Sequence, residues 1–203
     1  MALAEVLFTR AEIQARVREL AVELQSALGR ERPLLVSVLK GSVVFLADLV
    51  RNLEVDPDID FMSITSYGEG RSESGVVRIV KDLDEPLEGR DVVVVEDIVD
   101  TGLSLAYLLR TLQTRGPASL RVCALVQKQM QRIVDVDVQH VGFEVDRFVI
   151  GYGLDFQGRY RNLPDLVAVA DLASLAARPW LLTGLYRPIR AAREASERPD
   201  LGS

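Results

Sequence analysis

Apolar and polar positions along the chain follow two patterns, one with helical spacing and one with continuous β-branched runs. In residues 10–28, large apolar residues recur every three or four positions among arginines and glutamates, which is typical of an amphipathic helix. Thr9 precedes this stretch and Glu12 follows three residues later, a capping-box pattern in which each side chain accepts a free backbone N–H. We therefore expect a helix that begins after Thr9 and buries Ile13, Val17, Leu20, Leu24 and Leu28.

Several shorter apolar runs have the length and composition of strands. They are Leu34–Leu39, Ile59–Thr65, Val76–Val80, Val92–Val95, Leu120–Val126, Phe148–Ile150 and Val167–Val169. Continuous β-branched runs are typical of strands buried on both faces. Helix-favouring stretches follow two of them, at Val43–Leu53 and from Leu103. Strands that alternate with helices predict an α/β fold, with a mainly parallel twisted sheet flanked by helices.

One of these runs leads directly into acidic residues. Four valines, 92–95, are followed by Glu96, Asp97 and Asp100, and then by the turn Thr101-Gly102-Leu103-Ser104. In open α/β sheets, ligands bind at the carboxyl edge, where helix amino termini favour a phosphate. Adjacent carboxylates can accept hydrogen bonds from vicinal hydroxyls, so the segment predicts a site for a phosphorylated sugar. The alternative is a buried strand that ends in solvated acids.

Length and charge narrow the class of protein. The chain has 203 residues, 48% hydrophobic and 27% charged, which suits one soluble α/β domain. A net charge of −6 argues against a nucleic-acid-binding surface, which needs clustered positive charge. No apolar window is long enough to span a membrane, and no signal peptide is visible. The single Cys123 permits no internal disulfide, so we expect a cytoplasmic protein.

The acidic segment resembles the 5-phosphoribosyl-1-pyrophosphate (PRPP) motif of type I phosphoribosyltransferases. Its one glycine and three acids differ from the dinucleotide and P-loop fingerprints. The resemblance implies that PRPP is bound through its ribose and 5′-phosphate by Glu96, Asp97, Asp100, Thr101, Gly102, Leu103 and Ser104. Leu103 stands where many relatives carry lysine, and Ser104 where threonine is frequent.

Two further segments fit the 6-oxopurine branch of that family. Lys40-Gly41, after Leu39, is similar to the family's pyrophosphate-binding turn, in which the peptide bond before the lysine can be cis. Ser66-Tyr67 resembles the start of a catalytic lid, expected over residues 66–76, that excludes water from the reacting carbon. Taken alone, these segments could equally be an ordinary strand-to-helix turn and a mobile hairpin.

The resemblance also implies a purine site. Lys128 matches the lysine that donates to the 6-oxygen, and an ammonium, which has only donors, favours a 6-oxo over a 6-amino group. Phe148 would stack on the purine, and the backbone of Val149 would contact the base edge. Asp155 would hold Mg²⁺ together with Glu96 and Asp97. Arg161 matches the arginine that grips pyrophosphate.

These residues imply a purine-salvage transferase. We expect it to join hypoxanthine or guanine to PRPP in the presence of Mg²⁺, giving IMP or GMP and pyrophosphate, with Asp100 managing the N7 proton. A xanthine-preferring enzyme and a PRPP sensor without turnover remain alternatives. The family commonly forms dimers or tetramers, so a homo-oligomer is expected.

The resemblance also suggests how the chain is divided. We expect a single domain over residues 1–186, with a small hood built from the N-terminal segment and from residues after about 150. Residues 187–203 lack large apolar side chains and predict a flexible tail. His140 and Trp180, the only residues of their types, match no catalytic position of the family and are expected to be structural.

Overall fold

The computed structural model describes residues 3–28, 32–67, 76–130 and 132–186. The main body is a six-stranded sheet in the order β4-β3-β2-β5-β6-β7. Its strands are β2 (Leu34–Val38), β3 (Asp58–Tyr67), β4 (Val76–Lys81), β5 (Asp91–Val99), β6 (Ser119–Gln127) and β7 (His140–Glu144). All neighbours are parallel except β3 and β4. The predicted α/β class is confirmed.

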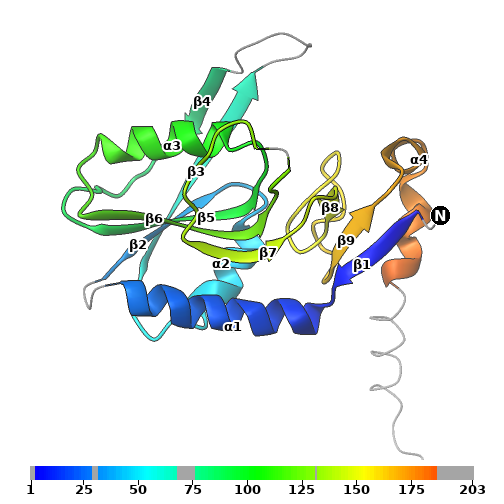
Figure 1. Cartoon of the computed structure of the whole chain (residues 1–203), viewed down its shortest axis with the longest axis horizontal. Helices are drawn as coiled ribbons and strands as arrows, with labels where there is room; N and C mark the ends of the chain where they lie inside the picture. Colours follow the sequence, from blue (N-terminus) through cyan, green and yellow to red (C-terminus); the bar gives the residue numbers. More distant parts are fainter. Residues whose placement is uncertain (1–2, 29–31, 68–75, 131, 187–203) are drawn as a thin grey trace, which may run out of the picture.

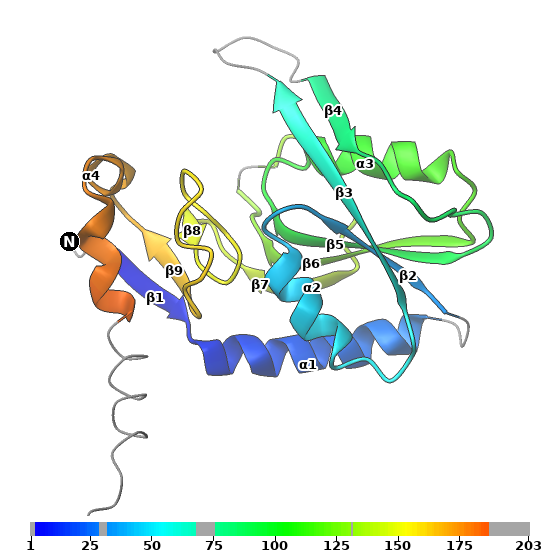
Figure 2. The same cartoon turned by 180° about the vertical axis from the view of Figure 1, so that it is seen from behind.

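Helices cover both faces of this sheet. α1 (Arg10–Ala27) and α2 (Val43–Val50) lie on one face, and α3 (Leu103–Gln113) lies on the other (Figures 1 and 2). Strand β5 shows why its valines are continuous. Val93 and Val95 pack against the α1 and α2 side, whereas Val92 and Val94 pack against the α3 side. All four are fully buried, as expected for a strand covered on both faces.

The first helix forms as its sequence predicts. Thr9 and Glu12 make the capping box, with the Glu12 carboxylate 2.8 Å from the Thr9 backbone nitrogen. The apolar stripe is buried, and Leu28 follows the helix as its C-cap residue. Arg16 ties α1 to β7 by donating to the backbone oxygens of Val141 and Gly142 at 2.8 and 3.1 Å. α2 ends at Val50, three residues before the predicted Leu53.

A second, three-stranded antiparallel sheet stands beside the main body. It has the order β1-β9-β8, formed by β1 (Ala4–Phe8), β9 (Leu166–Val169) and β8 (Val149–Ile150). α4 (Leu172–Ala177) and a 3-10 helix, η1 (Pro179–Tyr186), follow it. Leu175 and Leu182 join the apolar cluster that covers this small sheet (Figure 1).

This arrangement corrects one expectation. The runs at 148–150 and 167–169 were expected to extend the alternating parallel pattern, but they pair with β1 in the small sheet instead. The reason is that no helix separates them, and β8 and β9 pair antiparallel to each other. The predicted tail, 187–203, lies outside the described residues.

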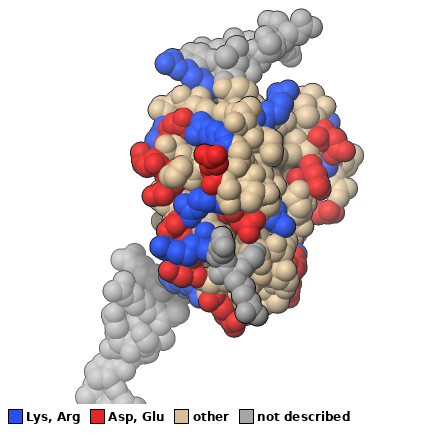
Figure 3. Space-filling view, turned by 90° about the vertical axis from the view of Figure 1, so that its left-hand side faces the viewer, with Lys and Arg blue, Asp and Glu red and all other residues tan. Residues whose placement is uncertain are grey.

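Ion pairs occupy the end of the main body at the left of Figure 1. Asp58 lies 2.7 Å from Arg32 and also contacts Arg90, which lies 3.5 Å from Glu85. Figure 3 views this end and shows acidic and basic side chains interleaved on the described part of the face. Among the described residues, no helix has the length and apolar character needed to cross a bilayer.

His140 supplies a prediction about stability. Its ring is buried at the start of β7, with Nδ1 3.8 Å from a Glu23 oxygen, and within the described chain Nε2 has no hydrogen-bond partner. Burial lowers the pKa of His140, although the Glu23 carboxylate acts in the opposite direction. Below about pH 6.5 the unfolded chain therefore gains a proton that the folded chain resists, and the free energy of unfolding falls. Above that pH the contribution is complete.

We expect His140→Gln to remove this part of the pH dependence. Urea unfolding between pH 5 and 8 measures the difference between wild type and variant. The difference between their free energies of unfolding should change by up to about 1.4 kcal/mol per pH unit below pH 6.5 and stay constant above that pH. Parallel stability curves over the whole range would show that His140 titrates alike in both states.

Candidate active site

The predicted site lies where the direction of the chain connections reverses. α2 leads from β2 to β3, whereas α3 leads from β5 to β6 on the other side of the sheet. Since β2 and β5 are neighbours, their carboxyl ends form a topological switch point, the usual ligand crevice of an open α/β sheet. The turn Lys40-Gly41 follows β2, and residues 96–104 end β5 and begin α3.

The acids at this edge belong to the strand itself. β5 continues to Val99, so Glu96 and Asp97 lie within it, and Glu96 is buried. Burial, and then the neighbouring Asp97 carboxylate, raise the pKa of Glu96 well above its usual value. Burial also raises the pKa of Asp97, although the backbone N–H of Ile98, 2.8 Å away, acts to lower it. A cation would offset both the burial and the repulsion of this pair.

Gly41 brings three segments into contact. A Cβ at Gly41 would overlap the carboxylate of Asp97, and a Cβ at Gly153 would overlap the carbonyl oxygen of Gly41. Only glycine allows such close approach of backbone to its neighbours. The peptide bond between Leu39 and Lys40 is cis, as the family resemblance allowed, and the Lys40 side chain is exposed.

The start of α3 forms a small cavity. Its volume is about 120 Å³, and its lining consists of Glu96, Ile98, Val99, Asp100, Thr101, Gly102, Ser104 and Leu105. Gly102 precedes the helix with φ of +80°, and a Cβ there would overlap the carbonyl oxygen of Val134. The first N–H groups of an α-helix have no intrahelical partner, so this cavity suits a phosphate. Leu103 is 45% exposed and is absent from the lining.

Asp100 and Lys128 form an ion pair that the sequence did not predict. β5 and β6 are adjacent, with Val99 paired to Gln127, so the residues that follow them lie side by side. Lys128 Nζ is 3.0 Å from Asp100 Oδ2, and Lys128 is buried. The other oxygen, Asp100 Oδ1, is buried without a hydrogen-bond partner in the described part of the chain. The pair presents a donor and an acceptor next to the small cavity.

Asp155 and Arg161 pair with each other. Their charged groups are 2.6 Å apart, and Arg161 also donates to the Gly153 carbonyl at 2.7 Å. Asp155 accepts the backbone N–H of Gly158 at 2.7 Å. Both charges act on Asp97: the Arg161 guanidinium lowers the pKa of the Asp97 carboxyl, and the Asp155 carboxylate raises it. Over the described ranges, no three histidines, cysteines or acids converge on one metal position, so Glu96, Asp97 and Asp155 do not form a three-carboxylate cluster here.

Two of the predicted base-contacting residues, Phe148 and Val149, lie at the small sheet, whereas Lys128 follows β6 of the main sheet. Phe148 is half-buried and makes an edge-to-face contact with Phe156, with ring centroids 5.7 Å apart. Val149 begins β8 and is buried, with its backbone opposite Ala168 of β9. Ser66 and Tyr67 end β3, whereas residues 68–75 of the predicted lid lie outside the described residues.

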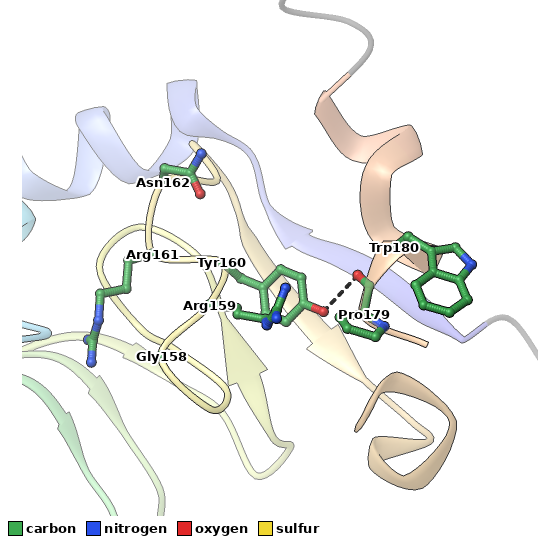
Figure 4. A pocket seen from close by; sticks show the side chains of 7 residues that line it. All are labelled: Gly158, Arg159, Tyr160, Arg161, Asn162, Pro179 and Trp180. Atoms are coloured by element: carbon green, nitrogen blue, oxygen red, sulfur yellow. Dashed lines mark hydrogen bonds between the residues drawn. The ribbon is translucent and has the colours of Figure 1, made fainter. Parts of the chain in front are cut away.

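A larger pocket, of about 530 Å³, opens on the other side of Arg161. It is lined by Gly158, Arg159, Tyr160, Arg161, Asn162, Pro179 and Trp180 (Figure 4). Tyr160 donates to the carbonyl of Pro179 at 2.8 Å, and Arg161 extends away from Trp180. The sequence could not indicate this pocket, because its two walls are separated in the chain and neither carries a recognisable motif.

Comparisons with known proteins agree with this geometry. The family model described as "Phosphoribosyl transferase domain" matches residues 7–157. A hypoxanthine-guanine phosphoribosyltransferase of Mycobacterium avium is 49% identical over 165 residues, covering 78% of this chain and 81% of the relative.

Solved structures agree as well. A hypoxanthine-guanine phosphoribosyltransferase of Bacillus anthracis superposes with a TM-score of 0.78 at 40% identity, covering 82% of this chain and 98% of the other. A structure named hypoxanthine-guanine-xanthine phosphoribosyltransferase has a TM-score of 0.75 at 40% identity, covering 82% and 97%. With the acids of β5 and the start of α3 placed at the switch point, the chain belongs to the phosphoribosyl transferase family.

Proposed function

We propose that this protein transfers the 5-phosphoribosyl group of PRPP to N9 of hypoxanthine or guanine, giving IMP or GMP and pyrophosphate. The observation that carries the proposal is the contact between Asp100 and Lys128 beside the α3 cavity. N7 and O6 are adjacent on one edge of a 6-oxopurine, so a neighbouring acceptor and donor fit both atoms at once. The activities named for the relatives support the same reaction.

PRPP would lie along the switch point. Its 5′-phosphate fits the α3 cavity, where Thr101, Gly102 and Ser104 line the wall. Its ribose hydroxyls would donate to Glu96 and Asp97. Its pyrophosphate would then extend toward the Lys40-Gly41 turn and Arg161, because Gly41 touches Asp97 on that side.

We infer Mg²⁺ as the metal of this reaction. Glu96 and Asp97 supply hard oxygen ligands, and because burial raises the pKa of both acids, a bound cation would favour their ionised forms. Mg²⁺ typically binds through one or two carboxylates plus substrate phosphates, so a three-carboxylate cluster is not required. Asp155, now paired with Arg161, would also help to hold the ion, through its carboxylate or a bound water. Held there, Mg²⁺ would supply positive charge to offset the charge of the pyrophosphate oxygens.

Each residue of the site would have its own role in the reaction. Cleavage of the anomeric C–O bond leaves positive charge on the ribose and negative charge on pyrophosphate, which Lys40 and Arg161 would stabilise. As the N9 lone pair forms the new bond to the anomeric carbon, Asp100 accepts the proton from N7. Lys128 donates to O6, and Phe148 turns from Phe156 to stack on the purine while the backbone of Val149 meets its edge.

Xanthine is a second candidate base. One structural neighbour carries xanthine in its name, and Lys128 donates equally well to the 6-oxygen of xanthine. Adenine is disfavoured, because its 6-amino group would face an ammonium donor. A PRPP sensor without turnover would instead bind PRPP and leave all bases unchanged.

We also propose the surroundings of this reaction. The small sheet would act as the hood over the purine, and Ser66 and Tyr67, at the end of β3, would begin the lid. We propose a cytoplasmic homodimer or homotetramer, because the family commonly forms such oligomers.

An assay with hypoxanthine, guanine, xanthine and adenine in turn tests the reaction directly. Nucleotide formation with PRPP and Mg²⁺ should be efficient for hypoxanthine and guanine, and kcat/KM for adenine should be lower by about 10²-fold or more, since a mismatched buried donor costs heavily. Liquid chromatography of the nucleotides measures all four bases, with a reaction lacking Mg²⁺ as control. If no nucleotide forms with any base although PRPP binds, the protein is a PRPP sensor rather than a transferase.

Asp100→Asn tests the proton acceptor. The amide keeps the size of the side chain but cannot accept the N7 proton as a base, so kcat should fall by about 10²-fold or more. The dissociation constant of PRPP, measured by calorimetry without a base, should change little. Asp84→Asn, at an acid that is 85% exposed on its side chain, is the matched control. Equal losses in kcat and PRPP binding would remove Asp100 from this role.

Gly41→Ala tests the contact with Asp97. The added methyl group must displace the carboxylate, so the KM for PRPP should rise by about 10²-fold, in line with the cost of a misplaced binding group. Gly89→Ala is the control for backbone strain: its φ of +70° disfavours alanine, but its Cβ would meet nothing within 4 Å, so it should lower stability yet leave the KM for PRPP unchanged. A variant that keeps the wild-type KM would show that Asp97 does not contact PRPP.

A further inference from the structure

A buried acid in α2 connects the two proposed pyrophosphate-binding segments. α2 has the sequence VVFLADLV, and Asp48 is its only charged residue, 8% exposed. A buried carboxylate is costly unless it is hydrogen-bonded. Asp48 accepts hydrogen bonds from Tyr152 at 2.6 Å and also from Gln14 and Arg51. The hydrogen bond from Tyr152 therefore joins α2 to the loop that follows β8; both elements are seen in Figure 2.

Tyr152 lies in an unusual stretch of backbone. It has φ of +48° between Gly151 at +92° and Gly153 at +100°, so three successive residues adopt conformations that L side chains rarely take. A non-glycine residue keeps such a conformation only where surrounding contacts impose it. Its backbone N–H donates to Leu163 at 2.8 Å, and its hydroxyl donates to Asp48.

The segment held by Tyr152 contacts both halves of the pyrophosphate site. The Gly153 carbonyl accepts a hydrogen bond from the Arg161 guanidinium, and the Gly153 N–H donates to the Arg161 carbonyl at 2.9 Å. On its other side, Gly153 lies against the carbonyl of Gly41 with no space for a Cβ. Asp48 is in the helix that follows Gly41, so one hydrogen bond joins the Lys40-Gly41 turn to the loop that orients Arg161.

We infer that Asp48 and Tyr152 are positioning residues, which fix the Lys40-Gly41 turn against Arg161 so that both meet the pyrophosphate of PRPP. Neither touches the substrate, and both act through Gly153. The inference rests on the proposed function for the identity of the ligand. It assigns to the Asp48–Tyr152 hydrogen bond a kinetic role that is confined to the pyrophosphate half of the site.

Tyr152→Phe tests the inference, because it removes only the hydroxyl. The KM for PRPP, and the KM for pyrophosphate in the reverse reaction, should each rise about tenfold, the effect of losing one charge-assisted hydrogen bond. The KM for hypoxanthine should stay near the wild-type value. A variant that only loosens the fold would raise all three constants together, and that result would overturn the inference, as would three unchanged constants.

Tyr160→Phe is a matched control. Tyr160 is also buried, has φ of +74° and donates its hydroxyl at 2.8 Å, but to Pro179 and away from Arg161 (Figure 4). Tyr160→Phe should lower thermal stability, but it should not raise the KM for PRPP relative to the KM for hypoxanthine. If it raises the PRPP constant as much as Tyr152→Phe does, the effect belongs to the small sheet as a whole, and the inference is wrong.

Asp48 provides a second route if Tyr152→Phe does not fold. Asp48→Ala removes the acceptor and should give the same selective rise, whereas Asp48→Asn keeps an oxygen for Tyr152 and should restore a PRPP constant near wild type. Equal behaviour of the two variants would overturn the role of the hydrogen bond. Wild-type turnover with PRPP is measured first, so a failure of the proposed function is recognised separately as an inactive wild-type protein.

Discussion

The close contact at Gly41 is the constraint on which the candidate site depends. The end of β2, the Asp97 carboxylate and the Gly153 segment meet there without space for a single methyl group. Because these parts come from the main sheet and from the loop after β8, the contact fixes the two against each other. It also places Asp97 close enough to Arg161 for the guanidinium to lower the pKa of that carboxyl. A binding surface assembled from distant segments needs a rigid reference of this kind.

Charge at this edge is unbalanced in a way that suits an anionic substrate with a cation. Glu96 and Asp97 resist ionisation because they are buried, while Lys128 and Arg161 already have acidic partners in Asp100 and Asp155. Binding would therefore rearrange existing contacts as well as fill the cavity at the start of α3. The cost of opening the Asp155–Arg161 ion pair would be offset only by a ligand that supplies matching groups to both residues, which is a source of selectivity.

The sequence predicted the parts of the fold that follow from local patterns. α1 formed at its capping box and β5 at its valines, because cap geometry and burial on both faces are recorded in consecutive residues. β1 and β7 were not predicted. β7 contains Gly142 and a histidine, and β1 is recognisable only by its pairing with β9, more than 150 residues away in the chain.

The same distinction applies to the site. The motif residues 96–104 gather at the switch point because they are consecutive, whereas the partners of Lys128, Arg161 and Tyr152 depend on which strands and loops become neighbours. A single sequence holds no signal for these pairs. Asp48 shows this most clearly. This acid lies inside the apolar helix VVFLADLV, and its burial is explained by hydrogen bonds such as the one from Tyr152, which is distant in the chain.

The pairing of β1 with β9 also governs the order in which the protein assembles. Ala4 lies opposite Val169, so β1 is synthesised more than 150 residues before the strand with which it pairs. The main sheet has all its strands by Glu144 and can fold while β1 is still unpaired. Closing so long a loop is entropically slow, so the small sheet is the last part to form during synthesis. A chain truncated before β9 would retain the sheet with the PRPP motif but lack the wall that faces it.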